Sequence, residues 1–126
     1  MTLEARMKKN VLSFPPSREH TLDSQLRFAI ANKRMIRFTY ESATRVAEPH
    51  DYGMRDGAAK LLAYQREKAG RKDQHVRGWR WLEVEKIQDC VVLEDSFSGT
   101  RETAGQHHHR WDVLYARVDR PPGGKD

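Results

Sequence analysis

The stretch Arg34-Met-Ile-Arg-Phe-Thr-Tyr40 decides the fold class, because apolar and polar residues alternate along it. An extended chain turns successive side chains to opposite faces, so Ile36, Phe38 and Tyr40 share one face. The stretch therefore predicts a β-strand with one face on an apolar core.

On the N-terminal side of this strand the apolar residues change to helical spacing. The spacing covers residues 22–30, and Thr21 is suited to cap the first turn. It predicts an amphipathic helix from about Leu22 to Lys33. Residues 1–20 include Phe14-Pro15-Pro16, and prolines disfavour regular structure, so we expect a flexible N-terminal arm there.

On the C-terminal side, turn residues divide the chain into four further strands. Residues 41–44 predict a turn, and Gly53 with Asp56-Gly57 indicates the next reversal, since Asp-Gly is a strong hairpin signal. Pro49 marks its strand as an edge strand or a bulged one. The four strands are expected at about 45–52, 59–66, 76–84 and 87–95. Five short strands after one helix predict a mainly β fold, a small closed or nearly closed antiparallel barrel capped by the helix.

The last part of the chain, residues 98–126, is expected to be a loop followed by a short element packed on the barrel. The loop is rich in Ser, Gly and Thr up to Gln106. Apolar residues between Trp111 and Val118 then recur at helical spacing, which favours a short terminal helix. A strand over the same residues is the alternative, because the segment is too short for periodicity to decide.

Size and composition bound the class of protein. The 126 residues suffice for one domain, and the longest apolar runs are far shorter than the ~20 residues that a membrane-spanning helix needs. No secretory pattern is present near the N-terminus, so we expect a cytoplasmic protein. The single cysteine, Cys90, lies in an apolar run and is expected to be a core residue.

The basic segment Arg66–Arg80 is the main functional signal. It carries six basic residues and two acidic ones, whereas the whole chain has a net charge of only +5. Cations that contact phosphates and flat rings on which bases stack are what single-stranded nucleic acid binding requires. The segment and the residue that follows it offer both kinds of side chain: Arg71, Lys72, Arg77, Trp79, Arg80 and Trp81. The alternative is a solvated loop followed by core tryptophans, although carboxylates on the same strand face favour at least one exposed indole.

The order of these elements resembles the WYL domain family. The matching pieces are residues 26–30, 36–40, Arg45 with Pro49 and His50, 61–64 ending in Tyr64, and 82–87. The resemblance implies an SH3-like or Sm-like barrel over residues 21–97 and a role in sensing ligands that include nucleic acids or nucleotides, often in bacterial transcription regulators. It adds Arg45, His50 and Tyr64 to the candidate ligand-binding residues. This chain departs from the family pattern at Ala59, Lys60 and Glu83, and it resembles a stand-alone member without a helix-turn-helix.

The sequence thus predicts a binding module and no enzyme. No nucleophile beside a base, catalytic carboxylate pair or phosphate-cradling glycine loop occurs at a recognisable spacing. The histidines at 107–109 are expected to be an incidental run, so we expect neither metal nor cofactor. The expected partner is single-stranded nucleic acid or a nucleotide, in transcriptional or defence regulation. The alternative is a protein-interaction module that forms a homodimer or docks on a larger regulatory protein.

Overall fold

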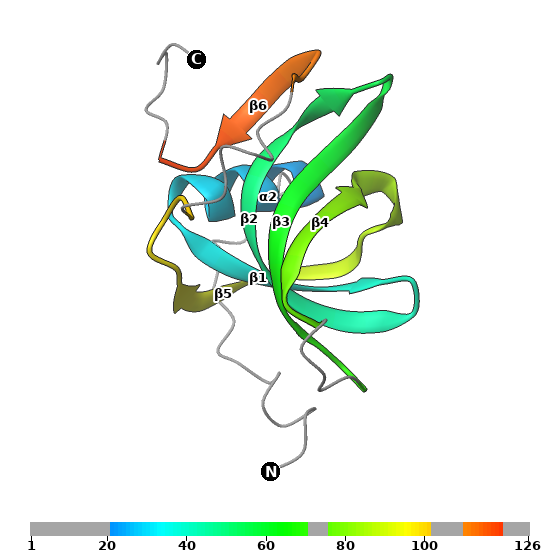
Figure 1. Ribbon diagram of the computed structural model, residues 1–126, viewed down its shortest axis with the longest axis vertical. Coiled ribbons are helices and arrows are strands. Elements are labelled where there is room, and N and C mark those ends of the chain that lie inside the picture. Colours follow the sequence, from blue (N-terminus) through cyan, green and yellow to red (C-terminus); the bar gives the residue numbers. More distant parts are fainter. Residues whose placement is uncertain (1–20, 71–75, 102–109, 120–126) are drawn as a thin grey trace.

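The computed structural model describes residues 21–70, 76–101 and 110–119, which form one α-helix and a β-sheet (Figure 1). The expected N-terminal arm lies outside the described residues. The elements in chain order are α2 (Leu22–Ala31), β1 (Arg34–Tyr40), β2 (Ala43–Arg55), β3 (Ala58–Lys68), β4 (Gly78–Glu83), the 3₁₀ helix η2 (Val84–Lys86), β5 (Gln88–Ser96) and β6 (Val113–Arg117). In the part of the chain that the structure describes, no helix is long and apolar enough to cross a membrane.

The helix begins where the sequence predicts and ends slightly earlier. Thr21 and Ser24 form a capping box, in which the side chain of each accepts a hydrogen bond from the backbone N–H of the other. The helix ends at Ala31 because Asn32 caps it and Lys33 has a positive φ of 54°. Leu26, Ala29 and Ile30 are buried against the sheet.

The strands form one antiparallel sheet in the order β4-β3-β2-β1-β5, so the expected mainly β fold with a leading helix is confirmed (Figure 1). β1 lies between β2 and β5. Within the described residues, the sheet is open along this path, since β4 and β5 at its two ends do not pair with each other.

β2 changes its neighbour halfway along its length, and this change positions a polar segment. Residues 43–47 pair with β1, whereas residues 51–54 pair with β6. The register against β3 also shifts between Pro49 and Asp51, so the strand is bulged at the proline as the sequence predicts. Glu48, Pro49 and His50 therefore lie where β2 leaves one neighbour and has not yet reached the next.

The C-terminal segment is a strand, so the favoured interpretation as a helix is wrong. Once β1 has ended, the second half of β2 has backbone groups left to pair, and β6 supplies the partners. A helix of a few residues would gain little by itself. The sequence suggested Gly53 as part of a reversal, but this residue lies inside β2. Glycine is required there because β6 approaches closely, and a Cβ would overlap the carbonyl oxygen of Val113.

The reversal comes three residues after Gly53, at Asp56-Gly57. These residues have φ angles of 54° and 81°, as the hairpin signal predicts. The tight turn brings Arg55, at the end of β2, and Lys60, near the start of β3, to the same end of the sheet.

The core lies between α2 and the curved sheet. Its largest fully buried apolar side chains are Phe38, Leu26, Ile30, Ile36, Leu61 and Leu93. Cys90 is partly buried and packs against this core, and burial raises the pKa of its thiol to about 12. The thiol is therefore a packing group and not a nucleophile at neutral pH.

Candidate ligand-binding site

β3 and β4 pair without a register shift, and this sets which side chains share a face. Tyr64 lies opposite Trp79, and Leu62 lies opposite Trp81. Since every second residue of a strand points to the same side, both tryptophans lie on one face of the sheet, together with Lys60 and Tyr64.

Trp81 is the exposed aromatic residue on this face. Its exposed fraction is 38%, the largest of any aromatic side chain in the described residues. The Arg55 guanidinium carbon lies 4.6 Å from the centre of its ring, and the Trp111 ring lies 5.4 Å away. An open hollow of about 260 Å³ adjoins the indole and is lined by Arg55, Asp56, Lys60 and Trp81. The hollow thus combines an aromatic surface with two cations.

The cations of the hollow are held by exposed carboxylates. Lys60 Nζ lies 3.5 Å from Glu83, and Arg55 Nε lies 3.8 Å from Asp56, whose side chain is 86% exposed. Glu83 also contacts Lys86 at 2.6 Å, and that contact lowers the pKa of Glu83. Exposed ion pairs contribute about 1 kcal/mol or less, so an incoming anion can replace these carboxylates at little cost.

Trp79 is less accessible than Trp81, because it packs at the edge of a buried cluster. Its ring centre lies 4.8 Å from that of His50 and 5.6 Å from that of Tyr64. His50 is fully buried and also contacts Phe97 at 5.3 Å. His50, which the resemblance added to the candidate ligand-binding residues, is therefore taken out of solvent by the bulge and by the cover of Phe97.

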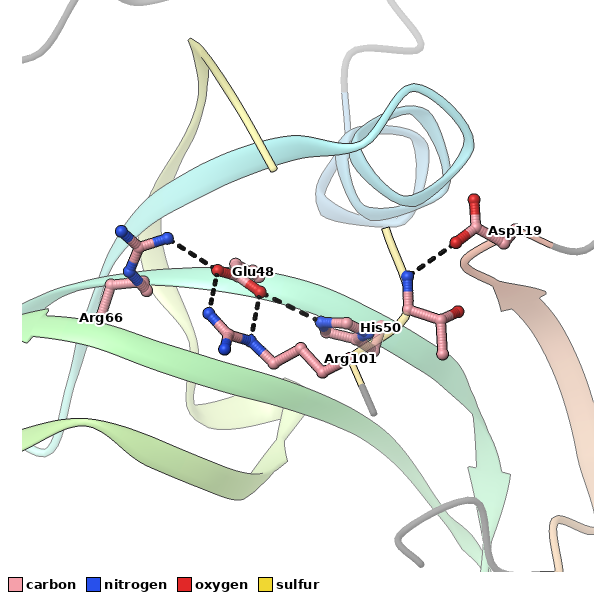
Figure 2. A network of polar contacts seen from close by, with 6 residues as sticks. Glu48, His50, Arg66, Arg101 and Asp119 are labelled. Atoms are coloured by element: carbon pink, nitrogen blue, oxygen red, sulfur yellow. Dashed lines mark hydrogen bonds and ion pairs between the residues drawn. The ribbon is translucent and has the colours of Figure 1, made fainter. Parts of the chain in front are cut away.

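Glu48 is the centre of this cluster, and Figure 2 shows the Arg66, Arg101 and His50 side chains gathered around its carboxylate. Arg101 donates two hydrogen bonds to Glu48, of 2.8 Å from Nε and 2.7 Å from Nη2. Arg66 Nη1 donates a third, of 2.8 Å, and His50 Nε2 lies 3.4 Å from the same carboxylate. The Arg101 guanidinium carbon also lies 3.5 Å from the centre of the Tyr64 ring. Two arginines thus share one carboxylate, which leaves a local charge of +1.

The network keeps Glu48 ionised although only 2% of the residue is exposed. Burial by itself raises the pKa of Glu48, but hydrogen bonds from His50, Arg101 and Arg66 outweigh it and lower the pKa to about 2. His50 Nδ1 is buried and has no hydrogen-bond partner among the described residues. The two arginines, in contrast, are each about one-third exposed and reach solvent.

A second polar contact holds Arg101 in place (Figure 2). The Asp119 carboxylate accepts a 2.6 Å hydrogen bond from the Thr100 backbone N–H and pairs with Lys33 at 2.7 Å. Phe97 in turn donates its backbone N–H to the Lys33 carbonyl oxygen. These contacts hold segment 97–101 against Lys33 and Asp119. They thereby place the Arg101 side chain beside Glu48.

The structure divides the residues that the sequence grouped into one site. Arg45 is buried and contacts Gln65 at 3.1 Å and Glu41 at 3.5 Å. Arg80 donates to the carbonyl oxygens of Trp79 and Val76, and strand alternation places it on the face opposite Trp81.

The other expected cations do not complete that site. Arg77 is exposed, whereas Arg71, Lys72 and the histidines at 107–109 lie outside the described residues. Within the described ranges, no group of three or more His, Cys, Asp or Glu side chains is placed to hold a metal ion.

Sequence reasoning missed the residues that complete the site: Arg55, Lys60, Arg66, Arg101 and Trp111. A signal existed for the first two, since they flank the Asp56-Gly57 turn. Glu48 also gave a signal, because a carboxylate within a buried strand needs cationic partners. The contribution of Arg101 depends on a distant segment, and no local pattern indicates it.

Comparisons of the chain with protein-family models, curated proteins and solved structures found no match. A function therefore has to be argued from the site itself.

Proposed function

We propose that the chain is a binding module for an anionic ligand with a flat ring, a nucleotide or a stretch of single-stranded nucleic acid. The ring stacks on Trp81, and Arg55 and Lys60 contact the phosphate. The observation that carries the proposal is the exposed indole beside two cations in one open hollow. Base stacking on an aromatic side chain contributes ~1–3 kcal/mol, and cations contribute the salt-dependent part.

The strand order supports a separate proposal, which concerns the fold and not the ligand. β5 pairs with β1, β4 and β5 are joined by one 3₁₀ turn, and the β2–β3 hairpin is bent. We infer that this arrangement is a WYL-like, SH3-like small barrel, which is compatible with a ligand sensor in transcriptional or defence regulation. The ligand hypothesis does not depend on this assignment, because it rests on the residues around Trp81.

The test is a titration of dye-labelled hexathymidylate followed by fluorescence anisotropy. We expect binding that weakens roughly sevenfold between roughly 50 and 200 mM salt, from about two phosphate contacts on a single strand. Trp81→Ala removes the stacking surface and is expected to weaken binding by ~1–3 kcal/mol. Arg37→Gln on β1 is the control, because it removes one charge at a residue that pairs with Val46, toward the opposite end of β2 from Arg55. The absence of binding at low salt would refute the proposal.

Self-association is the second candidate function. Val113, whose exposed fraction is 52%, and Trp81 are the exposed large hydrophobic residues of the described ranges, and Trp111 lies beside Trp81. Apolar groups of this kind favour an interface with a second copy. Light scattering separates the candidates, because a monomer at all concentrations would exclude self-association, whereas loss of the dimer in Val113→Lys would support it.

A further inference from the structure

A second cationic position, formed by Arg66 and Arg101, lies on the same face of the sheet as the hollow, at the other end of β3. Lys60, Leu62 and Tyr64 alternate along β3, so their side chains share one face. Arg66 is the extra residue of a bulge opposite Val46 and Ala47, and its guanidinium binds the same Glu48 carboxylate as Arg101 does. The Arg101 guanidinium stacks on the Tyr64 ring and therefore reaches this face as well. The face thus has Arg55 and Lys60 at one end and Arg66 and Arg101 at the other.

The two cationic positions are separated by more than one nucleotide can span. From Lys60 to Arg66 the strand rises about 20 Å, at ~3.3 Å per residue. Phosphates in a stacked strand are roughly 3.4 Å apart along the axis, and in an extended strand roughly twice that. The distance therefore corresponds to roughly three to six nucleotides.

The Arg66–Arg101 pair retains the capacity to bind an anion. Glu48 neutralises only one of the two charges, and both side chains are about one-third exposed. Between the two ends, Trp81 is exposed and Trp79 and Tyr64 are partly exposed, so aromatic rings line the path.

We propose that the β3–β4 face holds a single-stranded oligonucleotide that extends from Trp81 to the Arg66–Arg101 pair. This inference rests on the proposed function and names its ligand class: an oligonucleotide of several residues, of which a mononucleotide fills only the Trp81 end. Joining the two contacts in one ligand raises affinity, because the second contact forms at high effective concentration.

The experiment compares thymidine monophosphate with hexathymidylate on the full chain. We expect hexathymidylate to bind more tightly by roughly tenfold or more. Arg66→Gln should weaken hexathymidylate binding roughly threefold to tenfold and leave the monophosphate unchanged, whereas Lys60→Gln should weaken both. Arg66→Lys keeps the charge and should restore most of the hexathymidylate affinity.

The outcomes separate this inference from the proposed function. Equal affinity for the two ligands would overturn the inference and leave the Trp81 site intact, and this comparison uses the unaltered protein. Equal weakening of both ligands by Arg66→Gln would also overturn it, since Arg66 would then act only by supporting the fold. Binding of neither ligand would refute the proposed function itself.

Discussion

Glu48→Gln is expected to destabilise the protein by about 3 kcal/mol at neutral pH and by little near pH 2. Glutamine keeps the shape of the side chain but removes the charge that Arg66, Arg101 and His50 surround. The fall in the pKa of Glu48 from 4.5 to about 2 corresponds to about 3 kcal/mol, at about 1.4 kcal/mol per pH unit. A carboxyl group with a lowered pKa stabilises the fold above its unfolded value of 4.5, and this contribution disappears as the pH falls toward 2.

Urea unfolding followed by tryptophan fluorescence, at a series of pH values from about 2 to 7, measures this difference. The other carboxyl groups with lowered pKa in the described residues, Asp23, Glu83 and Asp119, are common to both proteins and cancel in the comparison. Glu94→Gln, at an exposed position on β5, is the matched control and should have no measurable effect. A difference between wild type and Glu48→Gln that stays constant from pH 7 to pH 2 would refute the reasoning, as would a difference well below 1 kcal/mol at pH 7.

Three further predictions concern packing and hydrogen bonding elsewhere in the fold. Gly99→Ala should lower the melting temperature by several degrees, because the residue has a φ of 121° and a Cβ would overlap the Asp119 carboxylate; an unchanged melting temperature would contradict this. Tyr52→Phe removes the 2.7 Å hydrogen bond to Asp23 and should cost about 1 kcal/mol in urea unfolding, together with a rise in the pKa of Asp23 seen by NMR titration. Cys90 should react slowly with a thiol reagent at pH 7 in the native protein and rapidly in urea, because burial raises its pKa to about 12, and rapid reaction of the native protein would show that the thiol is accessible.

The order and type of most elements follow from local patterns. Ile36, Phe38 and Tyr40 alternate, and in the structure all three are buried. Thr21 caps the helix, and Asp56-Gly57 closes the hairpin with the φ angles that such a turn needs. In each case the determining residues lie next to one another in the chain, so a single sequence contains the information.

The parts that could not be predicted depend on pairing between distant segments. The segment around Tyr115 becomes a strand only because half of β2 is left without a neighbour. His50 is buried only because Phe97 covers it, and Glu48 can be buried only because Arg101 reaches it from segment 97–101. The sequence indicated an exposed tryptophan, but the β2–β3 hairpin and the β3–β4 register determine which cations lie beside it.

The central claim, that a nucleotide-like ligand stacks on Trp81, is tested most directly by NMR of the indole N–H groups. The three tryptophans of the chain give three such resonances. On titration with hexathymidylate at low salt, the Trp81 resonance should move most and those of Trp79 and Trp111 less, and added salt should reverse the change. A Trp81 resonance that stays in place while the oligonucleotide is bound elsewhere, or three resonances that never move, would contradict the account.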